Sequence, residues 1–295
     1  MATITTASTN FPAELVAEVF SKVTGHSTLA KLSAQKPLPF AGNTEFVFSM
    51  DGEASIVGEG TEKAAGAADF TPVTIRPIKF VYQHRLTDEF VNMSEEKQLP
   101  YLTAFTEGFA KKMARALDIA AMHGVNPADG KASATIGANC FDSQVKNNVT
   151  YAAATVDENI DDAVALIQAN ELEVNGIALS QVAASALGKI KASGTGTYLY
   201  PEFRFGANPG IFGGMTADNN ATVSFGSNAD RIILGDFQNA FRWGYAESIP
   251  LEVIQYGDPD GQGDLKKLNE IVLRAEAYIG WGILSADSFA IVKTA

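Results

Sequence analysis

The segment from Ser94 to Gly124 carries the longest helical pattern in the chain and constrains the fold more than any other stretch. At 1.5 Å per residue, a helix over this segment is roughly 35–45 Å long. Pro100 leaves two alternatives: the helix begins at this residue, or it kinks there. Apolar side chains at three- and four-residue spacing form one stripe along the helix, namely Leu102, Phe105, Phe109, Met113, Ala116, Leu117 and Ala120. The opposite face carries Glu107, Lys111, Lys112, Arg115 and Asp118. We expect its basic cluster, Lys111, Lys112 and Arg115, to be solvated, with a contact to DNA as the alternative.

Composition limits the classes of protein that the chain can belong to. It has 295 residues, of which 46% are apolar, so it can build a sizeable core and is not disordered throughout. The net charge of −12 opposes general attraction to nucleic acid, and any DNA contact has to be local. No apolar run is long enough to span a membrane, and residues 1–10 lack the layout of a secretory signal. We therefore expect a protein made in the cytoplasm.

The first residues form a polar arm followed by a short amphipathic helix. Residues 1–10 are mostly Thr, Ser, Ala and Asn, and residues 11–27 place apolar side chains at helical spacing. A short helix on a flexible arm packs well only where a neighbouring surface receives it.

Two strands joined by a long polar tip follow the arm. Residues 44–50 alternate between polar and apolar side chains, and residues 70–86 return as a second strand. The alternation changes phase at Arg76, which precedes a proline and predicts a bend or bulge. Residues 51–69 between the strands are rich in Gly, Ala and Glu and form the tip.

Aromatic side chains on this hairpin have to be shielded from water by another surface. Phe46 and Phe48 lie on one face of the first strand. An isolated two-stranded hairpin is marginally stable in water, and exposed phenylalanines on it promote aggregation. Two alternatives follow: the hairpin folds back on its own core, or it lies on a neighbouring subunit.

The remainder of the chain mixes helices and strands, which indicates an α+β fold. Thr155 is expected to cap a helix over 156–170, and Ser180 to cap a helix that follows the buried strand 177–180. Residues 193–214 form a long glycine-rich loop with aromatic anchors. The predicted late strands cover residues 231–234, 240–246, 250–256, 269–284 and 287–293.

A search for reactive groups finds no catalytic constellation. The three histidines, His26, His84 and His123, and the single cysteine lack metal-ligand spacing, so we expect the histidines to be structural or exposed. We therefore predict no enzyme activity, no cofactor and no metal. One alternative stays open, a soluble hydrolase or metal-binding protein that uses the acidic loop 258–264, although Pro259 interrupts the calcium-loop pattern there.

Four phrases, taken in order, resemble the tailed-bacteriophage major capsid proteins of the Hong Kong 97 type. Each phrase alone is weak, but four in a consistent order over residues 10–293 are specific. They are VGEGTEKAAGAADFTPVTIRPIKFVYQHRLTDEF at 57–90, ALDIAAMHG before NP at 116–127, GTYLYPEF with IFGGM at 196–215, and ILGDFQNAFRWGYAESIPLEV at 233–253.

The resemblance implies the α+β capsid fold, divided into four parts. They are an N-terminal arm at 1–38; an extended hairpin loop at 39–80; a peripheral domain at 81–125 and 244–282, with its spine helix at 94–124; and an axial domain at 126–243 and 283–295.

It also implies a function by assembly. The chain is expected to form pentamers and hexamers of an icosahedral head that encloses double-stranded DNA without sequence-specific binding and without a membrane. The expected partners are a separate scaffolding protein, a portal and a decoration protein, and the expected location is the virion, assembled in the host cytoplasm. Residues expected to contact other subunits are Phe11, Leu15 and Val19 on the arm, Phe46, Phe48, Val73 and Ile75 on the hairpin, and Glu59, Glu62 and Lys63 near its tip.

Two further possibilities belong to the same resemblance. An encapsulin-like bacterial compartment shares the fold and would carry enzyme cargo. Some family members also join subunits by an isopeptide bond, and Lys63, Asn269 and Glu276 are of the residue types that this bond needs.

Overall fold

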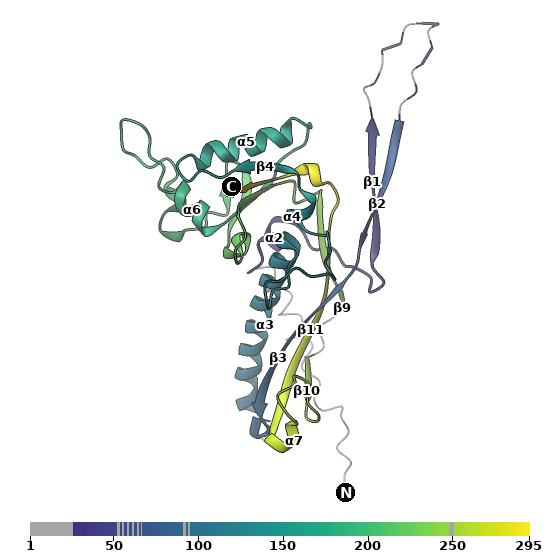
Figure 1. The fold of residues 1–295 in the computed structure, drawn as a ribbon, viewed down its shortest axis with the longest axis vertical. Coiled ribbons are helices and arrows are strands. Elements are labelled where there is room, and N and C mark those ends of the chain that lie inside the picture. Colours follow the sequence, from purple (N-terminus) through teal and green to yellow (C-terminus); the bar gives the residue numbers. More distant parts are fainter. Residues whose placement is uncertain are drawn as a thin grey trace.

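In the residues that it describes, the computed structural model contains one long helix and three β-sheets (Figure 1). Phe11, Leu15 and Val19 of the predicted arm lie outside the residues that it describes, so their contacts stay a prediction. The described residues are 26–51, 54, 56–57, 59–60, 62–63, 65, 67–90, 93, 95–247 and 251–295.

The long helix is α3 (Glu95–His123), which confirms the prediction to within one residue at each end. Pro100 lies inside it, so the alternative in which the helix begins at this proline is wrong. The predicted stripe is the buried face, with Phe109, Met113 and Leu117 almost completely covered. In the described part of the chain, no helix is both long enough and apolar enough to cross a membrane.

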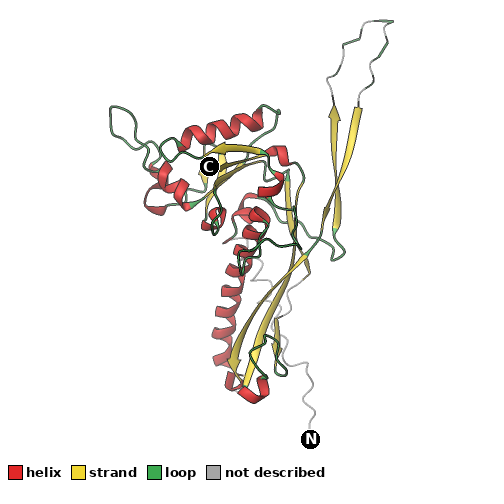
Figure 2. Cartoon of the chain, viewed as in Figure 1, coloured by secondary structure: helices red, strands yellow, loops and turns green. Residues whose placement is uncertain are grey.

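A four-stranded sheet runs alongside α3 (Figure 2). Its longest strand is β11 (Glu270–Ile283), which pairs antiparallel with β3 (Ile78–Thr87), with β10 (Leu251–Ile254) and with β9 (Phe241–Glu247). The short helix α7 (Leu265–Leu268) lies in the connection between β10 and β11. The predicted hairpin of late strands is therefore confirmed, although β10 is shorter than expected.

A six-stranded sheet forms the second half of the molecule. Its helices are α5 (Val156–Gln168) and α6 (Gln181–Leu187). Strand order across the sheet is β4 (Asn147–Thr150), β12 (Phe289–Lys293), β8 (Asp230–Gly235), β5 (Gly176–Leu179), β7 (Met215–Asn219) and β6 (Ile211–Phe212).

The central strands of this sheet are buried on both faces, which explains their nearly continuous apolar sequence. In β8, Ile232 and Leu234 pack into the core that contains α5 and α6. Ile233 between them points to the opposite face and joins the core built around α3 and β11. One sheet therefore separates the two hydrophobic cores and holds both together.

The smaller elements follow local signals to different degrees. Ser180 caps α6 as predicted, since its Oγ accepts a hydrogen bond from the Ala183 N–H at 3.2 Å. Thr155 is the N-cap residue of α5, but its side chain makes no capping bond. The short helices are α2 (Thr28–Leu32), α4 (Phe141–Gln144) and the 3₁₀ turns η2 (Asp88–Phe90), η3 (Pro201–Gly206), η4 (Ala221–Ser224) and η5 (Ala286–Ser288).

The predicted hairpin is the third sheet. It consists of β1 (Asn43–Asp51) and β2 (Ala67–Ile75), which pair antiparallel with each other and with no other described strand. The strand structure is interrupted between β2 and β3 at Arg76, where the alternation predicted a bend. The hairpin projects away from the body of the molecule (Figure 2).

Replacing Gly244 with alanine is expected to destabilise the fold. The Lys36 and Leu38 N–H groups donate to backbone carbonyls of β9, so the segment over 36–38 lies directly on Gly244. A Cβ at this position meets the Lys36 carbonyl oxygen at 1.7 Å. We expect Gly244→Ala to lower the free energy of unfolding by about 3 kcal/mol, measured by urea unfolding.

Gly108→Ala is the matched control for this substitution. Gly108 lies on the exposed face of α3, and a Cβ there meets no atom within 4 Å. Since alanine is the better helix former, the control is expected to gain up to about 1 kcal/mol. Equal unfolding midpoints for Gly244→Ala and the wild type would contradict the packing described here.

Candidate assembly interfaces

The hairpin exposes an apolar surface that the described part of its own chain does not cover. Phe46, Phe48 and Phe70, here called the hairpin aromatic face, have exposed fractions of 67%, 50% and 63%. Phe48 lies opposite Phe70 in the strand register, and their ring centroids are 4.8 Å apart. A contiguous aromatic surface on a two-stranded ribbon is typical of an interaction site.

The base of the hairpin is fixed to the body, which corrects one predicted contact. Ile75 is fully buried within its own chain, so its predicted role as an inter-subunit contact is wrong. It packs on β11 at Gly282, where a Cβ would lie 2.8 Å from Ile75 Cγ1. Val73 is half-buried against the same glycine, and Glu45 lies 3.7 Å from Arg242. The hairpin aromatic face lies beyond Ile75 and stays exposed for a partner.

The charged residues near the hairpin tip are exposed. Glu59, Glu62 and Lys63 all lie on the surface, so they are accessible to another chain, and their role in contacts stays a prediction. Glu276, considered above for a covalent cross-link with Lys63, forms an ion pair with Lys79 of its own chain at 2.7 Å.

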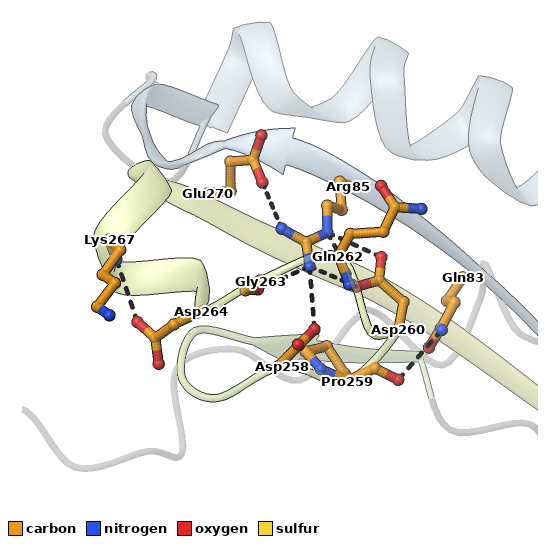
Figure 3. A network of polar contacts seen from close by, with 10 residues as sticks. All are labelled: Gln83, Arg85, Asp258, Pro259, Asp260, Gln262, Gly263, Asp264, Lys267 and Glu270. Carbon is orange, nitrogen blue, oxygen red and sulfur yellow. Dashed lines mark hydrogen bonds and ion pairs between the residues drawn. The ribbon is translucent and has the colours of Figure 1, made fainter.

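The acidic loop that resembled a calcium site surrounds an arginine instead (Figure 3). Arg85 of β3 donates from Nε to Asp260 at 2.8 Å, from Nη1 to Glu270 at 2.6 Å and from Nη2 to the Gly263 carbonyl at 2.9 Å. Its hydrogen bond lowers the pKa of Asp260 to about 2. Asp258 contacts the same guanidinium at 3.4 Å. A guanidinium therefore takes the place that a calcium ion would fill.

The third aspartate of that loop has a different local role. Asp264 is the N-cap of α7 and accepts a hydrogen bond from the Lys267 N–H at 3.1 Å (Figure 3). Asp258 and Asp260 thus hold Arg85, and Asp264 caps α7, so the metal-binding alternative loses its site.

A buried carboxylate fixes the first described residues of the chain. Asp118 of α3 accepts hydrogen bonds from Ser27 Oγ at 2.5 Å, from the N–H groups of Thr28 and Leu29 at 2.9 and 3.2 Å, and from Thr222 Oγ1 at 3.1 Å. Burial raises the pKa of Asp118 to about 6, although these four donors oppose the shift. Asp118 belongs to the polar face expected for α3, yet its side chain is completely buried.

A second aspartate holds the other side of the same segment. Asp218 of β7 accepts hydrogen bonds from Thr28 Oγ1 at 2.6 Å, Lys31 Nζ at 2.6 Å and Asn208 Nδ2 at 2.8 Å. The chain therefore enters the body at a defined place, between α3 and the six-stranded sheet. Sequence patterns could not find these two anchors, because their partners are about 90 and 190 residues away.

Comparison with known proteins agrees with this architecture. The sequence matches the phage capsid family over residues 10–294. The chain belongs to the phage capsid family. No curated protein matches it.

Solved structures extend the agreement to three dimensions. A structure from Mycobacterium phage Ogopogo is 34% identical, with a TM-score of 0.80 over 92% of each chain. One from Gordonia phage Cozz is 25% identical, with a TM-score of 0.76 over 92% of this chain and 87% of the other. The capsid of a native GTA particle, 19% identical, shares the fold with a TM-score of 0.60 over 91% of this chain and 90% of the other.

The predicted fold class is therefore confirmed. The chain has the mixed helix and sheet architecture of Hong Kong 97-like phage capsid proteins. Proteins of this family are structural components of the virion and assemble into multimeric shells.

Proposed function

We propose that this capsid protein is the major shell subunit, which forms pentamers and hexamers of an icosahedral head around double-stranded DNA. The hairpin aromatic face is the observation that carries the proposal. Three phenylalanines, each at least half exposed, lie on a ribbon without a third strand among the described residues. A neighbouring subunit that covers this ribbon removes apolar surface from water and links the two chains.

The proposed parts of the subunit have the bounds given above for the arm, the extended loop, the peripheral domain and the axial domain. One observation supports this division: the core between the six-stranded sheet and α5 and α6 is built from residues of the proposed axial domain. The core around α3 and β11 joins residues of both domains. In the proposed assembly, the axial domain gathers around the five- and six-fold axes. The hairpin and the part of the arm that precedes the anchored residues 27–38 join neighbouring subunits.

The net charge of −12 suits a wall that confines DNA without binding it tightly. A closed shell needs an entry for its genome, so we propose a portal as partner, together with a separate scaffolding protein and a decoration protein. Assembly is proposed to take place in the host cytoplasm.

Negative-stain electron microscopy of the full chain, expressed with and without its neighbouring genes, tests the proposal. Closed polyhedral shells or capsomer rings are the expected result, and DNA inside shells from infected cells identifies the cargo. A uniform small monomer under both conditions contradicts shell building. Shells that hold host enzymes instead of DNA contradict the proposed cargo and favour the compartment alternative.

A further inference from the structure

A buried group of three ionisable side chains lies outside the interfaces described so far. His123 ends α3, Asp142 lies in α4, and Asp230 begins β8; we name them the His123 cluster. One potential ligand atom from each lies within 4.8 Å of the others. The side chains of His123 and Asp230 are only 2% and 5% exposed.

The hydrogen bonds of His123 define which ring nitrogen carries a proton. Nε2 lies 2.9 Å from the carbonyl oxygen of Thr222, and since a carbonyl only accepts, Nε2 must donate. In the neutral ring, Nδ1 then has a free lone pair. It faces Asp142 Oδ2 at 3.1 Å and Asp230 Oδ2 at 3.7 Å. Three electron-rich atoms therefore converge on one point, which favours a positively charged occupant.

One oxygen of each carboxylate in the cluster also lacks a donor. Asp230 Oδ2 and Asp142 Oδ1 are buried without a hydrogen-bond partner among the described residues. A proton on Nδ1 neutralises one negative charge, whereas a divalent cation neutralises two and contacts all three side chains.

We propose that His123, Asp142 and Asp230 bind one divalent transition-metal ion of the Zn²⁺ class. Tetrahedral Zn²⁺ with bonds of about 2.1 Å separates its ligand atoms by about 3.4 Å. The measured separations of 3.1 and 3.7 Å lie on either side of that value. One imidazole nitrogen with two carboxylate oxygens suits zinc better than calcium or magnesium, which prefer oxygen ligands only.

The surroundings of the cluster supply the remaining requirements of a metal site. The Thr222 carbonyl orients the imidazole, and Asn228 Nδ2 donates to Asp142 Oδ2 at 2.8 Å, as outer partners of metal ligands commonly do. A cavity of about 640 Å³, lined by His123 and Asp142, gives access and leaves space for a water molecule as the fourth ligand.

This site was not visible in the sequence, which predicted no metal. Its ligands come from three elements that are distant along the chain and follow no ligand-spacing motif. A bound ion joins the end of α3 to α4 and to β8, so it stabilises the folded subunit by an amount that rises with the logarithm of the free-ion concentration above the Kd.

The test uses the full-length chain after treatment with a chelator. Isothermal titration with ZnCl₂ is expected to give one bound ion per chain and a raised unfolding temperature. Asp230→Asn is expected to weaken Zn²⁺ binding by at least about 10-fold. Asp129→Asn is the matched control, because Asp129 lines the same cavity but lies outside the cluster; it should bind Zn²⁺ like the wild type.

Two results would overturn the proposal: no Zn²⁺ uptake by the folded wild-type chain, or equal affinity in Asp230→Asn. If that variant does not fold, Co²⁺ added to the wild type provides an independent measurement. A visible absorption band that Zn²⁺ removes supports the site, and its absence overturns it. Shell formation does not enter these readouts, so the result is separate from that of the assembly experiment.

Discussion

Replacing the three phenylalanines of the hairpin aromatic face with serine is expected to stop the chain from closing shells while leaving it folded. Burying one phenylalanine contributes about 2 kcal/mol, so the triple variant Phe46→Ser, Phe48→Ser and Phe70→Ser removes about 6 kcal/mol of inter-subunit contact free energy. Since every 1.4 kcal/mol corresponds to a factor of ten, subunit affinity should fall about 10⁴-fold. Electron microscopy and size-exclusion chromatography should then show unassembled subunits or capsomers.

The fold should survive this change because the three rings contribute little to it. All three are at least half exposed, and none belongs to either hydrophobic core. The hairpin keeps its attachment through Ile75, which stays buried. Circular dichroism and the urea unfolding midpoint of the dissociated chain should therefore match those of the wild type within about 0.5 kcal/mol.

A leucine variant at the same three positions separates apolar contact from aromatic shape. Leucine keeps most of the apolar surface, so Phe46→Leu, Phe48→Leu and Phe70→Leu should still assemble, at a somewhat higher protein concentration. Normal shells from the serine variant at wild-type concentration would show that the hairpin aromatic face is not the contact that joins subunits.

Long periodic segments were predictable from the sequence because their pattern repeats many times. The bounds of α3 and of β11 were confirmed to within one residue at each end. The bend at Arg76 was also found, since a change of phase beside a proline is typical of a bend or a bulge. By contrast, α4 has four residues and no periodicity to detect.

Positions that depend on distant partners were not predictable. Alternation placed Ile75 on an apolar face of the hairpin, but only the fold shows that its own β11 covers that face. Helical spacing placed Asp118 among charged residues, because periodicity assumes that a polar side chain points to water. Arg85 could not be paired with Asp260 either, since the two are separated by 175 residues. In each case the missing information is tertiary, not local.

Asp118→Ala is expected to have the largest effect on the stability of the single chain. The substitution leaves four donors without an acceptor, from Ser27, Thr28, Leu29 and Thr222. Unsatisfied buried donors cost about 1–3 kcal/mol each, although rearrangement and water offset part of this loss. We expect a decrease of about 3–5 kcal/mol in the free energy of unfolding at pH 5. Urea unfolding can follow it through the buried Trp243 and Trp281.

The control is Asp162→Ala, an exposed aspartate on helix α5 whose loss should change stability by less than about 0.5 kcal/mol. If Asp118→Ala behaves like this control, the hydrogen bonds to Asp118 do not hold residues 27–29 to α3.

The pH dependence of the free energy of unfolding, measured for the wild type and for Asp118→Ala, tests the electrostatic part of this argument. The pKa of Asp118 is about 6 in the folded chain, against about 3.9 for an unfolded aspartate. Between these values the folded state keeps a proton that the unfolded state has lost, so stability from this group falls as the pH rises from about 4 to about 6. The full change is about 3 kcal/mol. Asp118→Ala lacks this dependence, so the stability difference between wild type and variant should narrow as the pH rises from about 4 to about 6. A difference that widens over this range would show that ionisation of Asp118 stabilises the fold.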